Sequence, residues 1–323
     1  PFWYARMQRE LNNVRAALRW GIDAGEVEHA LRLCGALGVF LYQRSWPGES
    51  RRWLAELLAS PGASQPTVGR GRALVSLGLL AWDQLEPDQA DVFLDEALAI
   101  LRACGDQSGI TGALAAKGRV AIVRGNYAQT RRLADEALAT APEGKPREIA
   151  LQVLGQACFY LADYPAARAC FEQTIAGRRG VQSTHTTADL TWLGHIATAS
   201  GDYAAARALY AESMRQRLTL DRKIGVAFTL SGLAGLAAAQ GQLARAVRIS
   251  GAAAHLCVIS GVPSHRAQEA YIRGRLPGIR EALGAAAYDA AWAEGSAMTP
   301  EQAVSYALEA GGSASAVKRS TQS

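Results

Sequence analysis

The sequence predicts an all-α protein: a superhelical stack of about six to seven helical hairpins, with further helices capping both ends. Three observations predict it. A short pattern of residues returns about every 40 positions along the chain. Between its copies, apolar residues follow the 3.6-residue period of amphipathic helices, in stretches of about 14 residues. Alternation with a period of two does not persist and β-branched residues are sparse, so strands are not expected.

The repeat is clearest in a dipeptide within the first helix of each predicted hairpin. A large residue is followed there by Gly or Ala. The copies are Leu37-Gly38, Leu77-Gly78, Lys117-Gly118, Leu154-Gly155, Leu193-Gly194 and Leu233-Ala234, with steps of 40, 40, 37, 39 and 40 residues. A small residue at this point lets two helices approach closely, because a larger side chain would push their axes apart.

A turn follows each dipeptide at a constant distance. Starting seven residues after the Gly or Ala, the turns are Ser45-Trp46-Pro47, Leu85-Glu86-Pro87, Gly125-Asn126-Tyr127, Ala162-Asp163-Tyr164, Gly201-Asp202-Tyr203 and Gly241-Gln242-Leu243. Five residues later the second helix carries a small residue: Ser50, Ala90, Thr130, Ala167, Ala206 or Ala246. A large apolar residue often follows after four more, as at Leu54, Leu94, Phe171 and Tyr210. We expect the recurring Tyr127, Tyr164 and Tyr203 to be structural.

These residues resemble the tetratricopeptide repeat (TPR), in which Leu-Gly and Tyr in the first helix precede a small residue, an aromatic residue and Ala. The resemblance covers Arg32 to His265 and implies an α-α solenoid. Lys117 departs from it by replacing Leu, and Ala234 by replacing Gly. The period also exceeds the roughly 34 residues of the family. The longer period predicts extended second helices or looser connections, such as Cys104 to Gly109 and Leu218 to Lys223.

The start of the chain is predicted to cap the solenoid. Residues 1–25 form the N-terminal cap, which contains an amphipathic helix over Gln8 to Ala24, and the solenoid occupies residues 26–265. The chain begins at Pro1 without an initiator Met and reads as a piece of a longer polypeptide.

The C-terminal cap, residues 266–310, is predicted to contain a helix over Ala282 to Glu294 and a last helix ending near Glu309. Thr299-Pro300-Glu301-Gln302 begins the last helix, because an N-cap Thr, a Pro at the first helical position and a Gln three residues after the cap form a capping box. Residues 311–323 have no apolar periodicity and are expected to form a flexible tail.

The two flanks carry a second, narrower resemblance. The opening ELNNVRAALRW, the later RRWLAELLA and the closing AWAEGSAMTPEQAVSYALE are similar to a region of large bacterial regulators. That region follows the nucleotide-binding ATPase domain in LuxR-type and NB-ARC-like signal-transduction proteins. The resemblance implies a sensor or assembly arm of a transcriptional regulator whose effector, a helix-turn-helix or another domain, lies elsewhere in the parent protein.

Composition limits the remaining possibilities. The 323 residues are 49% hydrophobic and carry a net charge of +5, which suits a packed globular chain. The longest apolar stretch, Ala227 to Ala239, is shorter than the roughly 20 residues that span a membrane, so no membrane protein is expected. Five cysteines without a CxxC motif favour a reducing, cytoplasmic location and are expected to be buried thiols. They are Cys34, Cys104, Cys158, Cys170 and Cys257.

Sequence motifs for catalysis or cofactor binding are not found. Gly144-Lys145 is followed by Pro146 and lacks the upstream Gly of a P-loop. The sequence contains no HExxH and no G-x-S-x-G, and its histidines have no acidic partner at metal-ligand spacing. Lys318 and Arg319 are too few to indicate nucleic-acid binding. We therefore expect no enzymatic activity, no cofactor, no metal and no direct contact with nucleic acid.

The candidate functional surface is the concave groove, which the first helices of a TPR-like stack line. Positions −6, −3, +1, +4 and +5 from the repeated Gly fall within one arc of about 100°. That arc mixes aromatic and amide side chains around a central Arg, and aromatic and Arg side chains are frequent anchors at protein interfaces. The candidate binding residues are Trp82, Arg119, Gln152, Gln156, Tyr160 and His195. In the competing interpretation they pack between repeats, as we expect of Trp192.

The leading hypothesis is a cytoplasmic, non-enzymatic arm of a bacterial regulator that binds a protein or peptide partner, or its own ATPase core, through the groove. Such binding is transmitted only if it favours one curvature or docking state of the stack. Alternatives are a small-molecule inducer site and a passive scaffold. An inducer site predicts a closed, partly apolar cavity between the second and fifth units, whereas a partner groove predicts Trp82 and Arg119 at least partly exposed. The sequence does not decide between the groove and the convex face.

Overall fold

The computed structural model describes residues 9–43, 47–178, 184–219, 223–259 and 278–309, and within these ranges it contains helices and turns but no strand. The predicted all-α fold is confirmed. None of the helices in these ranges is both long and apolar enough to span a membrane. The predicted tail, residues 311–323, and the predicted boundary at residues 265 and 266 lie outside the described residues.

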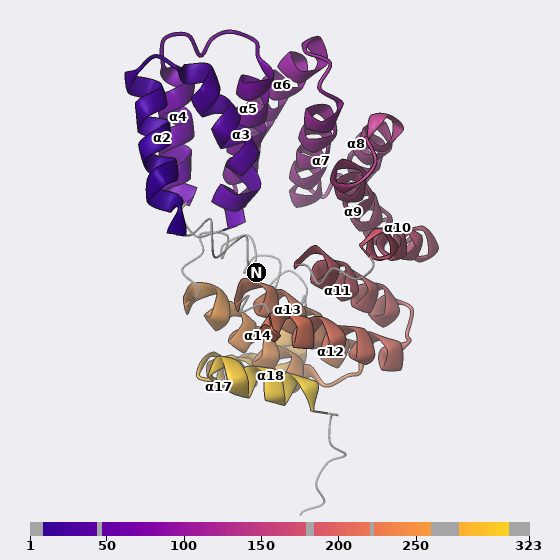
Figure 1. Ribbon diagram of the computed structural model, residues 1–323. Helices are drawn as coiled ribbons and strands as arrows, with labels where there is room; N and C mark the ends of the chain where they lie inside the picture. Colours follow the sequence, from indigo (N-terminus) through magenta and orange to yellow (C-terminus); the bar gives the residue numbers. More distant parts are fainter. Residues whose placement is uncertain (1–8, 44–46, 179–183, 220–222, 260–277, 310–323) are drawn as a thin grey trace, which may run out of the picture.

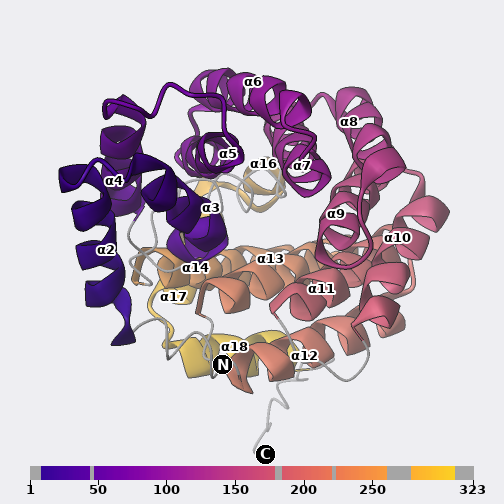
Figure 2. The ribbon, with the colours of Figure 1, turned by 45° about the horizontal axis from the view of Figure 1, so that its top comes forward.

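Paired antiparallel helices form the body of the molecule (Figure 1). The pairs are hairpin 1, α3 (Val27–Gln43) and α4 (Pro47–Ala59); hairpin 2, α5 (Val68–Asp83) and α6 (Pro87–Ala103); hairpin 3, α7 (Gln107–Val123) and α8 (Tyr127–Thr140); hairpin 4, α9 (Lys145–Tyr160) and α10 (Tyr164–Gly177); hairpin 5, α11 (Thr184–Ala199) and α12 (Tyr203–Thr219); and hairpin 6, α13 (Lys223–Ala239) and α14 (Leu243–Ile259). Figure 2 shows the stack curving strongly, with α5, α7 and α9 on its inner side and α6, α8 and α10 on its outer side.

The repeated small residues hold the two helices of each hairpin together. The second-helix positions Ser50, Ala90, Thr130, Ala167, Ala206 and Ala246 are all exposed by 1% or less. In hairpins 2, 4 and 5 the large residue four positions later covers the repeated Gly of the first helix, whereas in hairpin 3 Val153 of the next hairpin lies against Gly118. A Cβ added to Gly194 would lie 2.5 Å from the ring of Tyr210, and one added to Gly78 would lie 2.6 Å from Leu94. Glycine is therefore required there by close approach.

The hairpin turns share one left-handed residue. The glycines Gly125, Gly201 and Gly241 have φ values of 73°, 80° and 75°, and at the equivalent place Leu85 and Ala162 have 60° and 61°. In hairpins 3, 4 and 5 the next residue, Asn or Asp, accepts a hydrogen bond from a backbone N–H in the first turn of the second helix. The turn pattern in the sequence is thus both a backbone and a capping signal.

The long repeat period has a simple origin in hairpins 2 and 3. The 40-residue step accompanies a 17-residue α6, whereas the 37-residue step accompanies a 14-residue α8. Cys104 to Asp106 alone connects α6 to α7, so at this place a longer second helix and not a looser connection extends the repeat.

Both caps contain the predicted helices, with one difference. The N-terminal cap helix is α2 (Leu11–Asp23), and the C-terminal cap contains α16 (Ile279–Leu283), α17 (Ala285–Ser296) and α18 (Pro300–Leu308). The helix expected over Ala282 to Glu294 is divided at Gly284, whose φ of 78° and ψ of 147° cannot continue a helix. The capping box is confirmed, since Thr299 and Gln302 exchange side-chain to backbone hydrogen bonds.

Candidate functional site

The candidate residues all lie on the first helices of hairpins 2 to 5. Trp82 is on α5, Arg119 on α7, Gln152, Gln156 and Tyr160 on α9, and His195 on α11. Four of them, Trp82, Arg119, Gln156 and Tyr160, are partly exposed. Gln152 and His195 are only 6% and 0% exposed. The structure thus divides the candidates into a partly accessible set and a buried pair.

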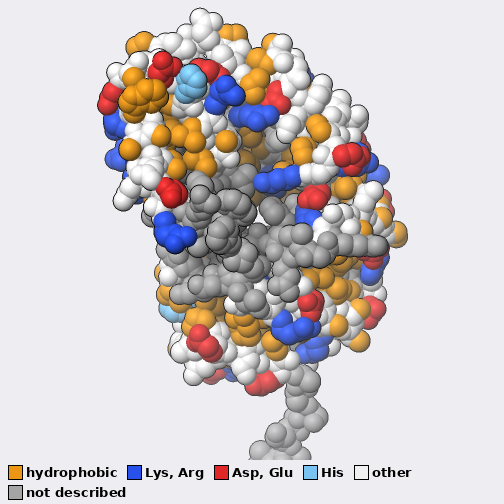
Figure 3. All heavy atoms as spheres, viewed as in Figure 1, with side chains coloured by type: hydrophobic (Ala, Val, Ile, Leu, Met, Phe, Trp, Pro, Cys, Tyr) orange, Lys and Arg blue, Asp and Glu red, His pale blue; other side chains and the backbone are white. Residues whose placement is uncertain are grey.

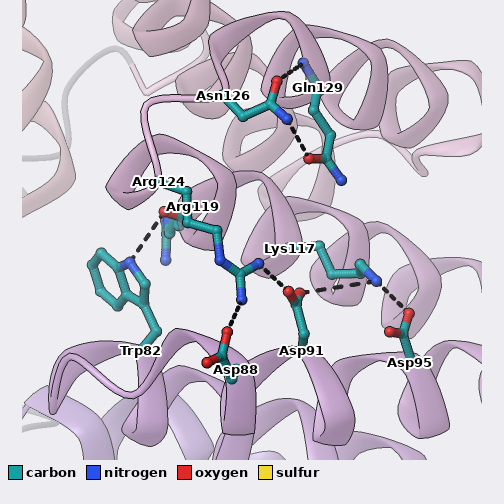
Figure 4. Close-up of polar contacts among 9 residues, drawn as sticks. All are labelled: Trp82, Asp88, Asp91, Asp95, Lys117, Arg119, Arg124, Asn126 and Gln129. Atoms are coloured by element: carbon teal, nitrogen blue, oxygen red, sulfur yellow. Dashed lines mark hydrogen bonds and ion pairs between the residues drawn. The ribbon is translucent and has the colours of Figure 1, made fainter.

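Trp82 joins hairpin 2 to hairpin 3. Its indole Nε1 donates a hydrogen bond to the backbone carbonyl of Arg119, with 3.1 Å between nitrogen and oxygen (Figure 4). An indole N–H that is partly removed from water needs such a partner. Both residues are partly exposed, as the partner-groove hypothesis requires.

Close to this contact, an ion-pair network joins α6 to α7 and explains why Lys117 replaces the Leu of the repeat. The Lys117 ammonium pairs with Asp95 and lies 4.0 Å from Asp91. The guanidinium of Arg124 pairs with Asp91 and, at 2.6 Å, with Asp88 (Figure 4). Lys117 is 15% exposed whereas Asp95 is 64% exposed. Here a partly buried ion pair takes the place of apolar contact between hairpins.

Tyr160 lies at the edge of an aromatic cluster. Its ring stacks on Tyr127 of the preceding hairpin with a centroid distance of 4.6 Å. Trp192 stacks on Phe171 at 5.9 Å and meets Phe159 edge to face at 5.5 Å. Trp192 is 6% exposed, so it belongs to the core between repeats as expected. The stacking of Tyr127 on Tyr160 is consistent with the structural role expected of Tyr127.

The candidate list omits two partly exposed rings of this cluster, Phe159 and Phe228. Both occupy positions on the same inner arc, and both contact the ring of Trp192 or His195. The recurrence of aromatic residues on the first helices of hairpins 4, 5 and 6 was a signal that could have found them.

Gln152 belongs to a buried polar cluster between hairpins 4 and 5. The Asp189 carboxylate, 1% exposed, accepts hydrogen bonds from Gln152 at 2.7 Å, Thr174 at 2.8 Å and Arg178 at 2.6 Å. Arg178 also pairs with Glu148 at 2.7 Å. Burial raises the pKa of Asp189, and the Arg178 guanidinium and the hydrogen bonds oppose that rise. The amide of Gln152 is therefore committed to the interior.

His195 is buried in a similar way. Its Nδ1 lies 2.8 Å from the hydroxyl oxygen of Tyr210, which is itself fully buried. The rings of Trp192 and Phe228 meet the imidazole edge to face at 5.2 and 5.7 Å. The expectation that Gln152 and His195 line an open groove is not met, because Gln152 is hydrogen-bonded to Asp189 of α11 and His195 to Tyr210 of α12 inside the molecule.

The cysteines and acids of the described chain show no arrangement suited to a metal. Within those ranges no group of three His, Cys, Asp or Glu side chains could hold an ion. Burial raises the pKa of Cys34 to about 12 and that of Cys170 to about 11, which disfavours the reactive thiolate. Cys104 corrects the expectation of uniformly buried thiols: it is exposed, with its Sγ 3.2 Å from the carbonyl of Pro66.

Two concave sites lie at the ends of the stack. A cavity of about 350 Å³ is bounded by α2 and α4 and lined by Arg15, Ala16, Leu18, Arg19, Ile22, Trp53 and Glu56. A second, of about 450 Å³, is bounded by α17 and α18 and lined by Glu294, Ala297, Met298, Gln302, Ser305, Tyr306 and Glu309. Neither lies between hairpins 2 and 5, where the alternative of a small-molecule inducer site predicts a cavity. Figure 3 shows that charges of both signs are interspersed with apolar side chains over one face.

Sequence comparison finds a match over part of the chain. No protein-family profile matches the chain. Proteins of Mycobacterium tuberculosis and Mycobacterium bovis named "Putative HTH-type transcriptional regulator" are 30% identical to it over 121 residues. The match covers 35% of this chain and 14% of the length of those curated relatives, so their activity as whole proteins is not established for this chain.

Structure comparison finds helical-repeat proteins. A Rap protein solved in complex with Competence and Sporulation Factor has a TM-score of 0.57 and 13% identity, covering 80% of this chain and 76% of its own. RapI in its apo form has a TM-score of 0.52 and 11% identity, covering 76% and 98%. BtubC from P. vanneervenii has a TM-score of 0.50 and 16% identity, covering 68% and 91%. At these identities the likeness establishes the TPR-like fold.

Proposed function

We propose that this chain is a non-enzymatic, partner-binding arm of a bacterial transcriptional regulator of the LuxR-type or NB-ARC-like class. The observation that carries the proposal is the row of partly exposed large side chains on successive inner helices, Trp82 on α5, Arg119 on α7, and Gln156 and Tyr160 on α9. Aromatic and Arg side chains on a rigid concave surface are favoured anchors for a protein or peptide. The partial match to HTH-type regulators supports the regulatory part.

The partner we propose is a protein or peptide segment, including a segment of the parent protein itself. The Rap protein solved with Competence and Sporulation Factor shares the fold and supports this class of ligand. A helical stack presents an extended concave surface, which suits an extended partner better than a compact metabolite. Binding would regulate an output domain by favouring one curvature of the stack.

The proposal that the chain catalyses no reaction rests on how its ionisable groups are used. Asp189, the buried carboxylate beside the inner wall, is saturated by Gln152, Thr174 and Arg178. His195 is enclosed by rings and bonded to Tyr210. Because Asp189 and His195 are buried and hydrogen-bonded in this way, neither can contact a substrate.

Site-specific photo-crosslinking tests the proposal. A photoreactive residue placed at Gln156, on the inner wall of α9, is expected to crosslink to one protein or peptide segment in cells that express the parent protein. The same residue at Val92, 65% exposed and on α6 at the outer side, is the matched control and is expected to give no crosslink to that partner. Gln156→Glu leaves the aromatic packing in place and is expected to weaken capture by a crosslinker at Arg119.

Three results would contradict this function. Equal crosslinking from positions 156 and 92 would show that the partner does not bind the inner wall in preference to the outer side. Crosslinking from position 92 alone would favour the convex surface. Stabilisation of the chain by a metabolite in a thermal-shift screen, with no crosslink from position 156, would instead support a small-molecule inducer.

A further inference from the structure

The end of α18 is held by two arginines from two different hairpins. Arg245 of α14 donates hydrogen bonds to the carbonyl oxygens of Tyr306 at 2.8 Å and Glu309 at 2.6 Å. Arg207 of α12 donates to the same Glu309 carbonyl at 3.2 Å. The last carbonyls of a helix have no partner within it, and their partial negative charge favours a cation. We call Arg207 and Arg245 with these carbonyls the arginine latch.

Tyr306 of α18 strengthens the latch through its ring. The guanidinium carbons of Arg245 and Arg248 lie 5.0 and 5.6 Å from the ring centroid. Arg248 also donates to the Tyr306 hydroxyl at 2.7 Å and to a carboxylate oxygen of Glu294 on α17 at 2.6 Å. Polar and cation–π contacts with α14 therefore add to the apolar packing of Ala303, Val304 and Ala307 that docks α18 on the core.

The neighbouring α17 is attached in a different way. A Cβ on Gly295 would lie 1.9 Å from the carbonyl oxygen of Arg248, and one on Gly251 would lie 2.4 Å from that of Trp292, so the backbones of α14 and α17 touch. By contrast, α18 buries three small or medium side chains, Ala303, Val304 and Ala307. Figures 1 and 2 both place α18 beside α12 and α17, at the surface of the molecule.

The latch closes only if hairpins 5 and 6 keep their relative position. Arg207 is on the second helix of hairpin 5 and Arg245 on that of hairpin 6, yet both reach the carbonyl of Glu309. Arg207 also lies 3.4 Å from the Gln240 side chain at the turn of hairpin 6. A change in the angle between the two hairpins draws one guanidinium away from that oxygen.

We propose that α18 is a detachable helix whose docking reports the geometry of hairpins 5 and 6 through the arginine latch. When the latch opens, α18 leaves the stack, while α17 remains fixed by its glycine contacts. This device couples the shape of the superhelix to the docking of α18. The proposed detachment of α18 depends on no property of the inner wall, so it can be tested independently of the proposed function.

Hydrogen exchange followed by mass spectrometry on the full chain tests the proposal. Backbone amides of α18 are expected to exchange faster than those of α14 and α17. Arg245→Ala is expected to accelerate exchange in α18 about ten- to a hundredfold, because hydrogen bonds from a charged donor are lost, and to leave α17 unchanged. Arg207→Ala is expected to have a smaller effect in the same direction. Arg280→Ala, which removes an exposed pair with Asp289 on α17, is the matched control.

The link to the hairpins has its own test. A Cβ on Gly232 of α13 would lie 2.5 Å from the Tyr210 ring of α12, so Gly232→Ala wedges hairpin 6 away from hairpin 5 without touching α18. We expect it to accelerate exchange in α18 relative to α17. Unchanged α18 exchange in Gly232→Ala would overturn the coupling. Equal acceleration of α14, α17 and α18 in Arg245→Ala, or none in any of them, would overturn the detachable helix itself.

Discussion

Hairpins 2 and 3 and hairpin 5 follow one repeat pattern but are stabilised differently. In hairpins 2 and 3 the core is mainly aliphatic, and the ionic contacts of Asp88, Asp95 and Arg124 lie at the surface. Hairpins 2 and 3 bury three polar side chains with exposures of 6% or less, Asp83, Thr111 and Thr130. Among the described side chains, hairpin 5 and its boundaries bury six: Thr187, Asp189, Thr191, His195, Ser213 and Arg217. The comparison shows that the repeat pattern determines the geometry of the helices. It does not determine whether the contacts within and between hairpins are apolar or polar.

The two kinds of interior respond differently to substitution. An aliphatic core loses stability in proportion to the volume removed. A buried polar cluster behaves as a unit, because removing one partner leaves others without hydrogen bonds in a medium where this is costly. In hairpin 5, the hydroxyls of Thr191 and Ser213 lie 2.9 Å apart and Arg217 donates to Ser213, so few members can change alone.

The largest expected effect is that of Asp189→Asn. It removes the buried negative charge opposite Arg178, whose side chain is 9% exposed, and we expect the free energy of unfolding to fall by about 3 kcal/mol. Urea denaturation measures this. Asp88→Asn in hairpin 2 is the control, since Asp88 is 98% exposed and its partner Arg124 is 39% exposed, so a loss below about 1 kcal/mol is expected. Equal losses in the two variants would remove the distinction between the regions.

Glycine substitutions sharpen the comparison at the level of packing. Gly194→Ala in hairpin 5 places a Cβ 2.5 Å from the enclosed Tyr210 ring and is expected to cost about 1–3 kcal/mol. Gly112→Ala on α7 has no atom within 4 Å of the new Cβ and is expected to stabilise the chain by about 0.5–1 kcal/mol. Thermal unfolding should move in opposite directions. A shared direction would show that the close Gly–Tyr contact is not needed.

Substitutions in two hairpin turns are expected to change the stability less, and again in opposite directions. Leu85 adopts a left-handed φ of 60° where Gly125 in the next hairpin has 73°. Leu85→Gly relieves steric strain and is expected to stabilise the chain by about 1 kcal/mol or less, since added backbone freedom offsets part of the gain. Gly125→Ala is expected to destabilise it by about 1 kcal/mol. Chemical denaturation of both variants checks the shared turn geometry.

Lys117→Leu is expected to have the smallest effect. It restores the residue of the repeat and removes the pairs with Asp91 and Asp95, and the two changes offset to within about 1 kcal/mol. The informative measurement is salt dependence, because a surface network is screened by ions. We expect the variant to lose less stability than the wild type between low and high salt. An identical salt dependence would mean that the network stabilises nothing.

The sequence predicted correctly which helices carry the candidate residues, but it did not predict which of these residues are exposed and which are buried. Trp82, Arg119, Gln156 and Tyr160 were chosen by their place on one arc, and the structure leaves them partly exposed. Gln152 and His195 satisfy the same rule and are buried. An arc of about 100° on one helix includes both positions that face the groove and positions that face the next hairpin. The curvature of the stack decides which positions face the next hairpin and are buried.

By itself the sequence determined the helical hairpins, their turns and the capping box of the last helix, although it did not predict the break at Gly284. Those features depend on contacts within a few residues or within one hairpin, so period, small residues and cap residues encode them directly. Only the tertiary structure decided that Lys117 pairs with an aspartate of α6 and that Asp189 accepts hydrogen bonds from three side chains. It also decided that Arg207 and Arg245 both donate to the carbonyl of Glu309. These contacts join residues in different hairpins, and their distances depend on how each unit is placed on the one before it.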